Sequence, residues 1–159
     1  MLIEDWIAWL LSVLLSFTGV PCVADGSAVY VQSLNHRFVV ILSCVDLVGI
    51  GLWTFIFTFV VWVYTSLNNL SISRRKYTLV GFLGYTVFFL ANIFRMFIEI
   101  LYVANAGGDY IIYVSRWQAF EEQVGIGIML ATFTTLFLGF YFVFRRQKPH
   151  CVGVIDGKR

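Results

Sequence analysis

The chain has 159 residues, of which 60% are hydrophobic and only 13% are charged, and its mean hydropathy is +0.84. A soluble domain is usually about half apolar and about a quarter charged, so this composition excludes disorder and an ordinary soluble domain. The net charge of +2, with scattered basic residues, excludes a nucleic-acid-binding surface. The remaining class is an integral membrane protein with one domain.

Four apolar stretches reach or approach the roughly 20 residues that a membrane-spanning helix needs. They cover residues 2–17, 38–67, 77–103 and 124–144. The first is short and begins with two acidic residues instead of the positive charge of a secretory signal peptide, so cleavage is not expected. The alternative for this stretch is a peripheral or half-buried helix. We predict an all-α membrane protein, a four-transmembrane-helix bundle.

The first loop, between the first two stretches, has the residues of a small β-hairpin. Gly19-Val20-Pro21 ends the first helix, and Asp25-Gly26 is a turn signal. Residues 28–32 are rich in β-formers. We therefore expect paired strands at 20–23 and 28–32, on the outer surface of the membrane.

The orientation follows from the lysines and arginines. Three of the eleven lie at 74–76, between the second and third stretches, and five follow the fourth stretch in 145–159. The positive-inside rule places these segments, and with four spans both termini, in the cytoplasm. Residues 1–144 then form one transmembrane domain of the plasma membrane, and residues 145–159 form a cytoplasmic basic tail. The loops at 18–37 and 104–123 face outward.

Polar residues inside the apolar stretches are the candidate functional residues, because charges at membrane depth usually face a bundle interior or a water-filled cavity. The expected spans contain Asp46, Arg95 and Glu99. Arg95 and Glu99 are four residues apart and share a helix face. Cys44 lies one turn into the second stretch, and Glu121 precedes the fourth. One interpretation is a buried charge cluster of Asp46, Arg95 and Glu99 that holds the bundle together, because buried charges must pair.

Cysteine and histidine provide no pattern for a metal or cofactor site. Cys22 and Cys44 are expected on the outer side and Cys151 on the inner side, so one disulfide is conceivable. His36 and His150 fall on opposite sides of the membrane. No metal-ligand spacing, haem-attachment motif or Gly-rich phosphate loop is present, so we expect neither a metal nor a cofactor.

The order of these features resembles the exosortase/archaeosortase family of multi-spanning prokaryotic membrane proteins. That family has a Gly-rich outer hairpin, a cysteine that opens a span, Asn-x-x-Arg in the next span, and His with Gly four residues on. The matching segments here are the hairpin at 19–31, Leu-Ser-Cys-Val-Asp at 42–46, Ala-Asn-Ile-Phe-Arg at 91–95 and Phe-Glu-Glu-Gln-Val-Gly at 120–125. The resemblance covers most of residues 8–144.

The resemblance implies a cysteine transpeptidase that acts on C-terminal sorting signals. Cys44 would be the nucleophile that forms the acyl-enzyme. Arg95 would stabilise the thiolate or the oxyanion, and Asn92 would orient Arg95. The family's histidine position falls on Glu121, a carboxylate that cannot form imidazolium. Asp46 stands where the family has glycine, and its charge opposes thiolate formation unless Arg95 neutralises it.

Two functions from different classes remain. The departures from the family pattern fall on the chemistry, which favours an accessory or structural subunit of a larger membrane complex, with altered or lost transpeptidase chemistry. Its partners would be membrane lipids and other membrane protein subunits. The alternative is an active membrane cysteine transpeptidase or protease that processes surface proteins with C-terminal sorting signals, with His36 as a possible substitute base. A transporter or channel is disfavoured because four spans show no internal repeat.

Overall fold

The computed structural model describes residues 3–68, 70, 72–106 and 110–145, without the side chains of 42–43, 106 and 110–119. It is mostly helical, with a small sheet. The elements in chain order are α1 (Ile3–Phe17), β1 (Cys22–Asp25), β2 (Ala28–Val31), the 3₁₀ turn η1 (Gln32–Leu34), β3 (His36–Val39), α2 (Leu42–Val45), α3 (Leu47–Leu67), α4 (Arg74–Ala106) and α5 (Tyr110–Arg145).

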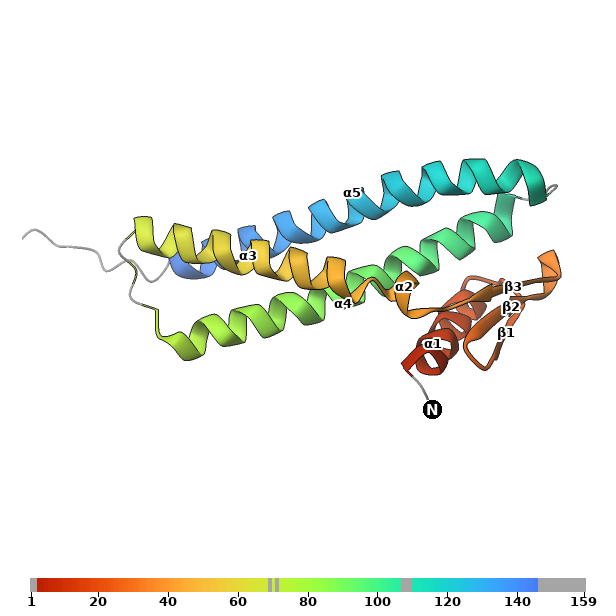
Figure 1. Ribbon diagram of the computed structural model, residues 1–159, viewed down its shortest axis with the longest axis horizontal. Coiled ribbons are helices and arrows are strands. Elements are labelled where there is room, and N and C mark those ends of the chain that lie inside the picture. Colours follow the sequence, from red (N-terminus) through yellow and green to blue (C-terminus); the bar gives the residue numbers. More distant parts are fainter. Residues whose placement is uncertain (1–2, 69, 71, 107–109, 146–159) are drawn as a thin grey trace, which may run out of the picture.

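Three long helices, α3, α4 and α5, run along the long axis of the molecule, and α1 and the sheet gather beside one end of them (Figure 1). In the described part of the chain these three are the helices long and apolar enough to cross a membrane, over Leu47–Leu67, Arg74–Asn105 and Phe120–Arg145. These three helices agree with the prediction of a multi-pass membrane protein.

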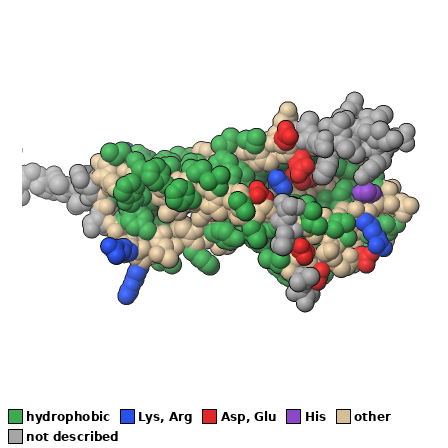
Figure 2. Space-filling model, in the orientation of Figure 1, with side chains coloured by type: hydrophobic (Ala, Val, Ile, Leu, Met, Phe, Trp, Pro, Cys, Tyr) green, Lys and Arg blue, Asp and Glu red, His purple; other side chains and the backbone are tan. Residues whose placement is uncertain are grey.

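The three long helices pack through a core of aromatic and aliphatic side chains, the buried members of which are Ile50, Phe57, Val61, Phe88 and Met129. Large apolar side chains also cover the outside of the bundle, as expected for a surface that faces lipid. Figure 2 shows this face as mainly hydrophobic, with charged side chains gathered near the sheet and basic side chains at the far end. The charge distribution thus separates the two ends of the bundle.

The first apolar stretch does not form a helix of spanning length. Helix α1 has 15 residues, or about 22 Å at the α-helical rise, against a hydrocarbon core about 30 Å thick. It contacts β1, β2 and α4, and it runs across α4 instead of alongside the three long helices (Figure 1). The prediction of four spans is therefore supported only for the last three stretches.

The predicted hairpin is present but belongs to a three-stranded antiparallel sheet in the order β1-β2-β3. Strands β1 and β2 pair with Cys22 opposite Val31, and Gly26 in their turn has φ +60°, a conformation that glycine adopts without strain. Strand β3 takes up the beginning of the stretch predicted to be the second span. Its Arg37 forms an ion pair with Asp25 of β1 at 2.8 Å across the sheet. An unbroken apolar run from residue 38 had hidden this strand.

The second apolar stretch also contains a helix break. The short helix α2 ends at Val45, Asp46 adopts the left-handed conformation with φ 47° and ψ 52°, and α3 begins at Leu47. The Oδ1 atom of Asp46 accepts a hydrogen bond from the backbone N–H of Gly49 at 3.0 Å. Aspartate tolerates left-handed geometry better than most residues and is a favoured helix cap. Asp46 therefore ends one helix and starts the next.

Candidate functional site at the helix break

The carbonyl groups at the end of α2 are bound by side chains of α4. The Nδ2 atom of Asn92 donates to the carbonyl oxygens of Val45 at 2.6 Å and Cys44 at 3.2 Å. A terminal nitrogen of Arg95 donates to the same Cys44 oxygen at 3.3 Å. The last carbonyls of a helix lack partners within the helix, and groups shielded from water must find partners in the protein. Asn92 and Arg95 therefore connect the helix break to α4.

Arg95 is also paired along its own helix. Its Nε atom lies 3.3 Å from the Oε1 atom of Glu99, and the two side chains are only 17% and 7% exposed. The pair is close enough for strong attraction, although this nitrogen and this oxygen do not have hydrogen-bond geometry. The Oδ1 atom of Asn92 is buried without a hydrogen-bond partner as well. Glu99 is thus the acidic partner of Arg95 within the same helix.

Helix α5 reaches this cluster through a glycine. A Cβ atom added to Gly125 would lie 3.2 Å from the Cδ atom and 3.4 Å from a terminal nitrogen of Arg95. Glycine at this position therefore lets α5 approach the arginine side chain closely. Glu121, one helical turn earlier and half-buried, lies close enough for its charge to act on Glu99. The backbone of α5 and one of its acidic residues complete the site.

The site lies at the level where α3 begins. The 21 residues of α3 extend about 31 Å, which matches the hydrocarbon thickness of about 30 Å. Arg95 stands 21 residues after Arg74, the first residue of α4, and therefore at a similar height. If α3 spans the membrane, the helix break, Arg95 and Gly125 are at the membrane boundary on the side of the sheet.

The predicted site residues are only partly brought together. Cys44 is half-buried and its thiol is free. Asn92 and Arg95 donate hydrogen bonds to its carbonyl oxygen and not to its sulfur. Asp46 is exposed and caps α3, so the predicted three-charge cluster separates into a buried Arg95–Glu99 pair and a helix cap. Sequence reasoning treated Asp46 as a buried charge because it lies in an apolar run.

Cys22 faces α1 and not the site. Its sulfur lies 3.3 Å from the carbonyl oxygen of Ser12 and 3.7 Å from the hydroxyl of Ser16. Cys22 and Cys44 are both free, so the conceivable disulfide between them is absent. Cys151, His150 and the basic tail lie outside the described residues. Within the described ranges, no three His, Cys, Asp or Glu side chains gather as a possible metal site.

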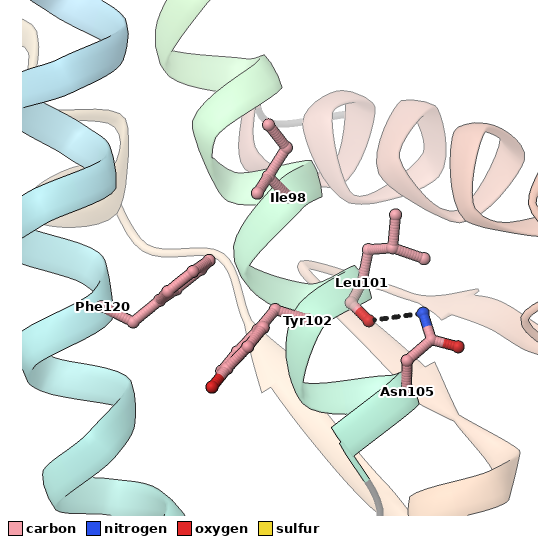
Figure 3. Close-up of a pocket in the computed structure, with 5 residues that line it drawn as sticks. All are labelled: Ile98, Leu101, Tyr102, Asn105 and Phe120. Carbon is pink, nitrogen blue, oxygen red and sulfur yellow. Dashed lines mark hydrogen bonds between the residues drawn. The ribbon is translucent and has the colours of Figure 1, made fainter.

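An open groove of about 420 Å³ lies between α4 and α5, further toward the sheet end of these helices; its lining residues are Ile98, Leu101, Tyr102, Asn105 and Phe120. Figure 3 shows Tyr102 and Phe120 extending toward each other from the two helices. Their rings stack with centroids 4.0 Å apart. The Asn105 amide donates to the carbonyl of Leu101 at 2.9 Å, within its own helix. The groove is therefore mainly apolar and offers few polar groups for orienting a substrate.

Two roles in the site were not predicted from the sequence. Gly125 was considered as the end of the 120–125 segment of the family resemblance, and the backbone carbonyls of Cys44 and Val45 were not considered at all. The spacing of Asp46 and Gly49 was an available signal, because an Asp side chain that caps a helix accepts from a backbone N–H two or three positions on. No sequence pattern predicts which backbone carbonyls an asparagine far along the chain will bind.

Neither a protein-family model, nor a curated protein, nor a solved structure matches this chain. The contacts of Cys44 and Arg95 are therefore the basis for assigning chemistry to the site. A catalytic cysteine requires a cationic or basic group that acts on its sulfur. Arg95 instead donates to the Cys44 carbonyl, pairs with Glu99, and lies 3.2 Å from where a Cβ atom at Gly125 would stand. This arrangement is suited to holding a broken helix against two continuous ones.

Proposed function

We propose that this chain is an archaeosortase-like multi-pass protein of the plasma membrane whose transpeptidase chemistry has been altered or lost, and that it acts as an accessory subunit of a larger membrane complex. The observation that supports this is the engagement of Arg95. Its charge is balanced by buried Glu99, and it donates to the backbone of Cys44. An arginine held in this way contributes to architecture without having to stabilise a thiolate.

The lipid-facing surface supports a role in assembly. Only 6% of the apolar window of α5 is buried within the chain, compared with 33% for α4. A helix that is apolar on all sides is normally surrounded by lipid or by other helices. We propose that α5 offers the main surface for neighbouring subunits, with the basic connection at 74–76 and the tail at 145–159 in the cytoplasm.

Native mass spectrometry of the chain, extracted from its own membrane in mild detergent, tests this function. We expect a complex with a fixed ratio of this chain to other membrane proteins. We also expect Cys44→Ser to leave that ratio unchanged, with Cys22→Ser as the matched control. A monomer whose Cys44 holds the C-terminal tail of a surface protein would refute the accessory function.

The second candidate is the active cysteine transpeptidase, and one observation favours it. Cys44 has a free thiol on the sheet side of the bundle, and its own residue is contacted by Arg95. In this reaction the Cys44 sulfur would attack a peptide carbonyl after losing its proton to Glu121. The C–N bond would break, the amine would leave with a proton, and a thioester would remain for an incoming nucleophile. A hydroxylamine-sensitive adduct on Cys44, absent in Cys44→Ser, would establish this chemistry.

A further inference from the structure

Helix α1 is apolar on two opposite faces. One face is buried against the sheet and α4, and its buried apolar residues are Ile7, Ala8, Leu11 and Leu15. This face belongs to one hydrophobic cluster with Val29 and Val31 of β2 and with Ile93, Met96 and Ile100 of α4. The fold of the sheet end therefore accounts for only half of the surface of α1.

The opposite face of α1 is also apolar, with Ile3, Trp6 and Phe17 exposed and Leu10 and Val13 half-buried. Ile3, Trp6, Leu10, Val13 and Phe17 follow each other at alternating intervals of three and four residues, which places them in one stripe along the helix. Trp6 is 41% exposed, and Trp9 beside the stripe is 52% exposed. A helix that buries one apolar face in its own protein and exposes a second apolar stripe requires a second apolar environment. Tryptophan is enriched where membrane meets water.

The position and direction of α1 identify that environment. Its buried face packs on residues 93–100 of α4. This is the level at which α3 begins, which is the membrane boundary if α3 spans the membrane. Figures 1 and 3 show α1 running across α4 instead of parallel to it. A helix that crosses a spanning helix at this level lies along the membrane surface.

We infer that α1 is an interfacial anchor: it lies in the plane of the outer membrane surface, with the Trp6–Trp9 face inserted at the boundary between headgroups and acyl chains. The partner of this face is the lipid bilayer itself. No lysine or arginine occurs in α1, so its attachment depends on apolar burial and not on anionic lipid. The N-terminus then lies outside the cell, opposite to the location predicted from four spans.

Nitroxide labels placed one at a time at Trp6, Val13 and Phe17 test this arrangement in phosphatidylcholine proteoliposomes. The background carries serine at the three native cysteine positions, and variants are used only if their circular dichroism matches the parent. Collision rates with oxygen and with a water-soluble nickel chelate give the depth of each label. We expect similar, shallow depths at all three positions. A spanning helix would instead change depth by about 16 Å between residues 6 and 17, which would overturn the inference.

Two other outcomes would also overturn it. A high collision rate with the nickel chelate at every position would show a face exposed to water. Immobile labels shielded from both reagents would show that a second copy of the chain covers the face. An independent measurement is labelling of Glu4→Cys in intact cells with a membrane-impermeant maleimide. We expect labelling without permeabilisation, whereas the control Arg75→Cys should require it; the reverse result for Glu4→Cys would contradict the outer location.

Discussion

Removal of the Asn92 amide is the most direct test of the helix break. Its Nδ2 atom bonds the carbonyls of Val45 and Cys44, and the residue is only 1% exposed. In Asn92→Ala the Val45 carbonyl loses this donor, whereas the Cys44 carbonyl keeps Arg95. Leaving a buried acceptor without its partner costs about 1–3 kcal/mol. We therefore expect the free energy of unfolding to fall by about 2 kcal/mol, or about 30-fold in the unfolding equilibrium constant.

The assay is reversible unfolding in mixed micelles of a mild detergent and SDS, followed by far-UV circular dichroism. Asn92→Leu separates hydrogen bonding from packing, because it restores volume without a donor and should remain destabilised. Asn105→Ala is the matched control, since this amide lies on the same helix and donates to Leu101 within it. The control should change the free energy by less than about 0.5 kcal/mol. Equal effects for Asn92→Ala and Asn105→Ala would refute the proposed role of Asn92.

Three further substitutions probe the same site in the same unfolding assay. Gly125→Leu should destabilise the fold by about 1–3 kcal/mol, because its Cβ would press on Arg95. Gly127→Leu should not, because nothing lies within 4 Å of a Cβ added at that position. Equal effects of the two substitutions would contradict close packing at Gly125. Glu99→Ala should cost about 3 kcal/mol, because it leaves Arg95 buried and unpaired; a neutral result would mean that water reaches the arginine. Asp46→Ala should cost about 2 kcal/mol through the lost cap and the left-handed backbone, and Asp46→Gly should cost less; the opposite order would exclude backbone strain as the cause.

The three long apolar helices could be predicted because length and apolarity are properties of a continuous segment. Their boundaries were less accessible: α4 and α5 extend to Ala106 and back to Tyr110, beyond the apolar stretches. Helix α1 shows why two interpretations of the first stretch remained open. Hydropathy gives the same signal for a helix that spans lipid and for one that buries one face in protein. Only contacts with β1, β2 and α4 distinguish the two cases.

The site was predictable where it depends on the spacing of residues along one helix, and not where it depends on the backbone conformation of a single residue. The four-residue interval placed Arg95 and Glu99 on one face, and the structure has them 3.3 Å apart. The environment of Asp46 could not be obtained in this way, because a charge in an apolar run suggests burial. Its left-handed backbone brings it to the surface and turns its side chain toward Gly49. A single residue's backbone conformation thus changed a buried charge into a helix cap.

The break between α2 and α3 also explains why polar residues from separate segments meet at one level. A helix that ends near the membrane boundary exposes carbonyl oxygens where water is scarce, and these need donors from a neighbouring helix. Asn92 supplies one donor, and Arg95 supplies another but introduces a charge. Glu99 balances that charge, and Gly125 leaves room for the side chain that carries it. Each polar group follows from the preceding one, so the cluster has a complete structural reason to exist before any reaction is assigned to Cys44.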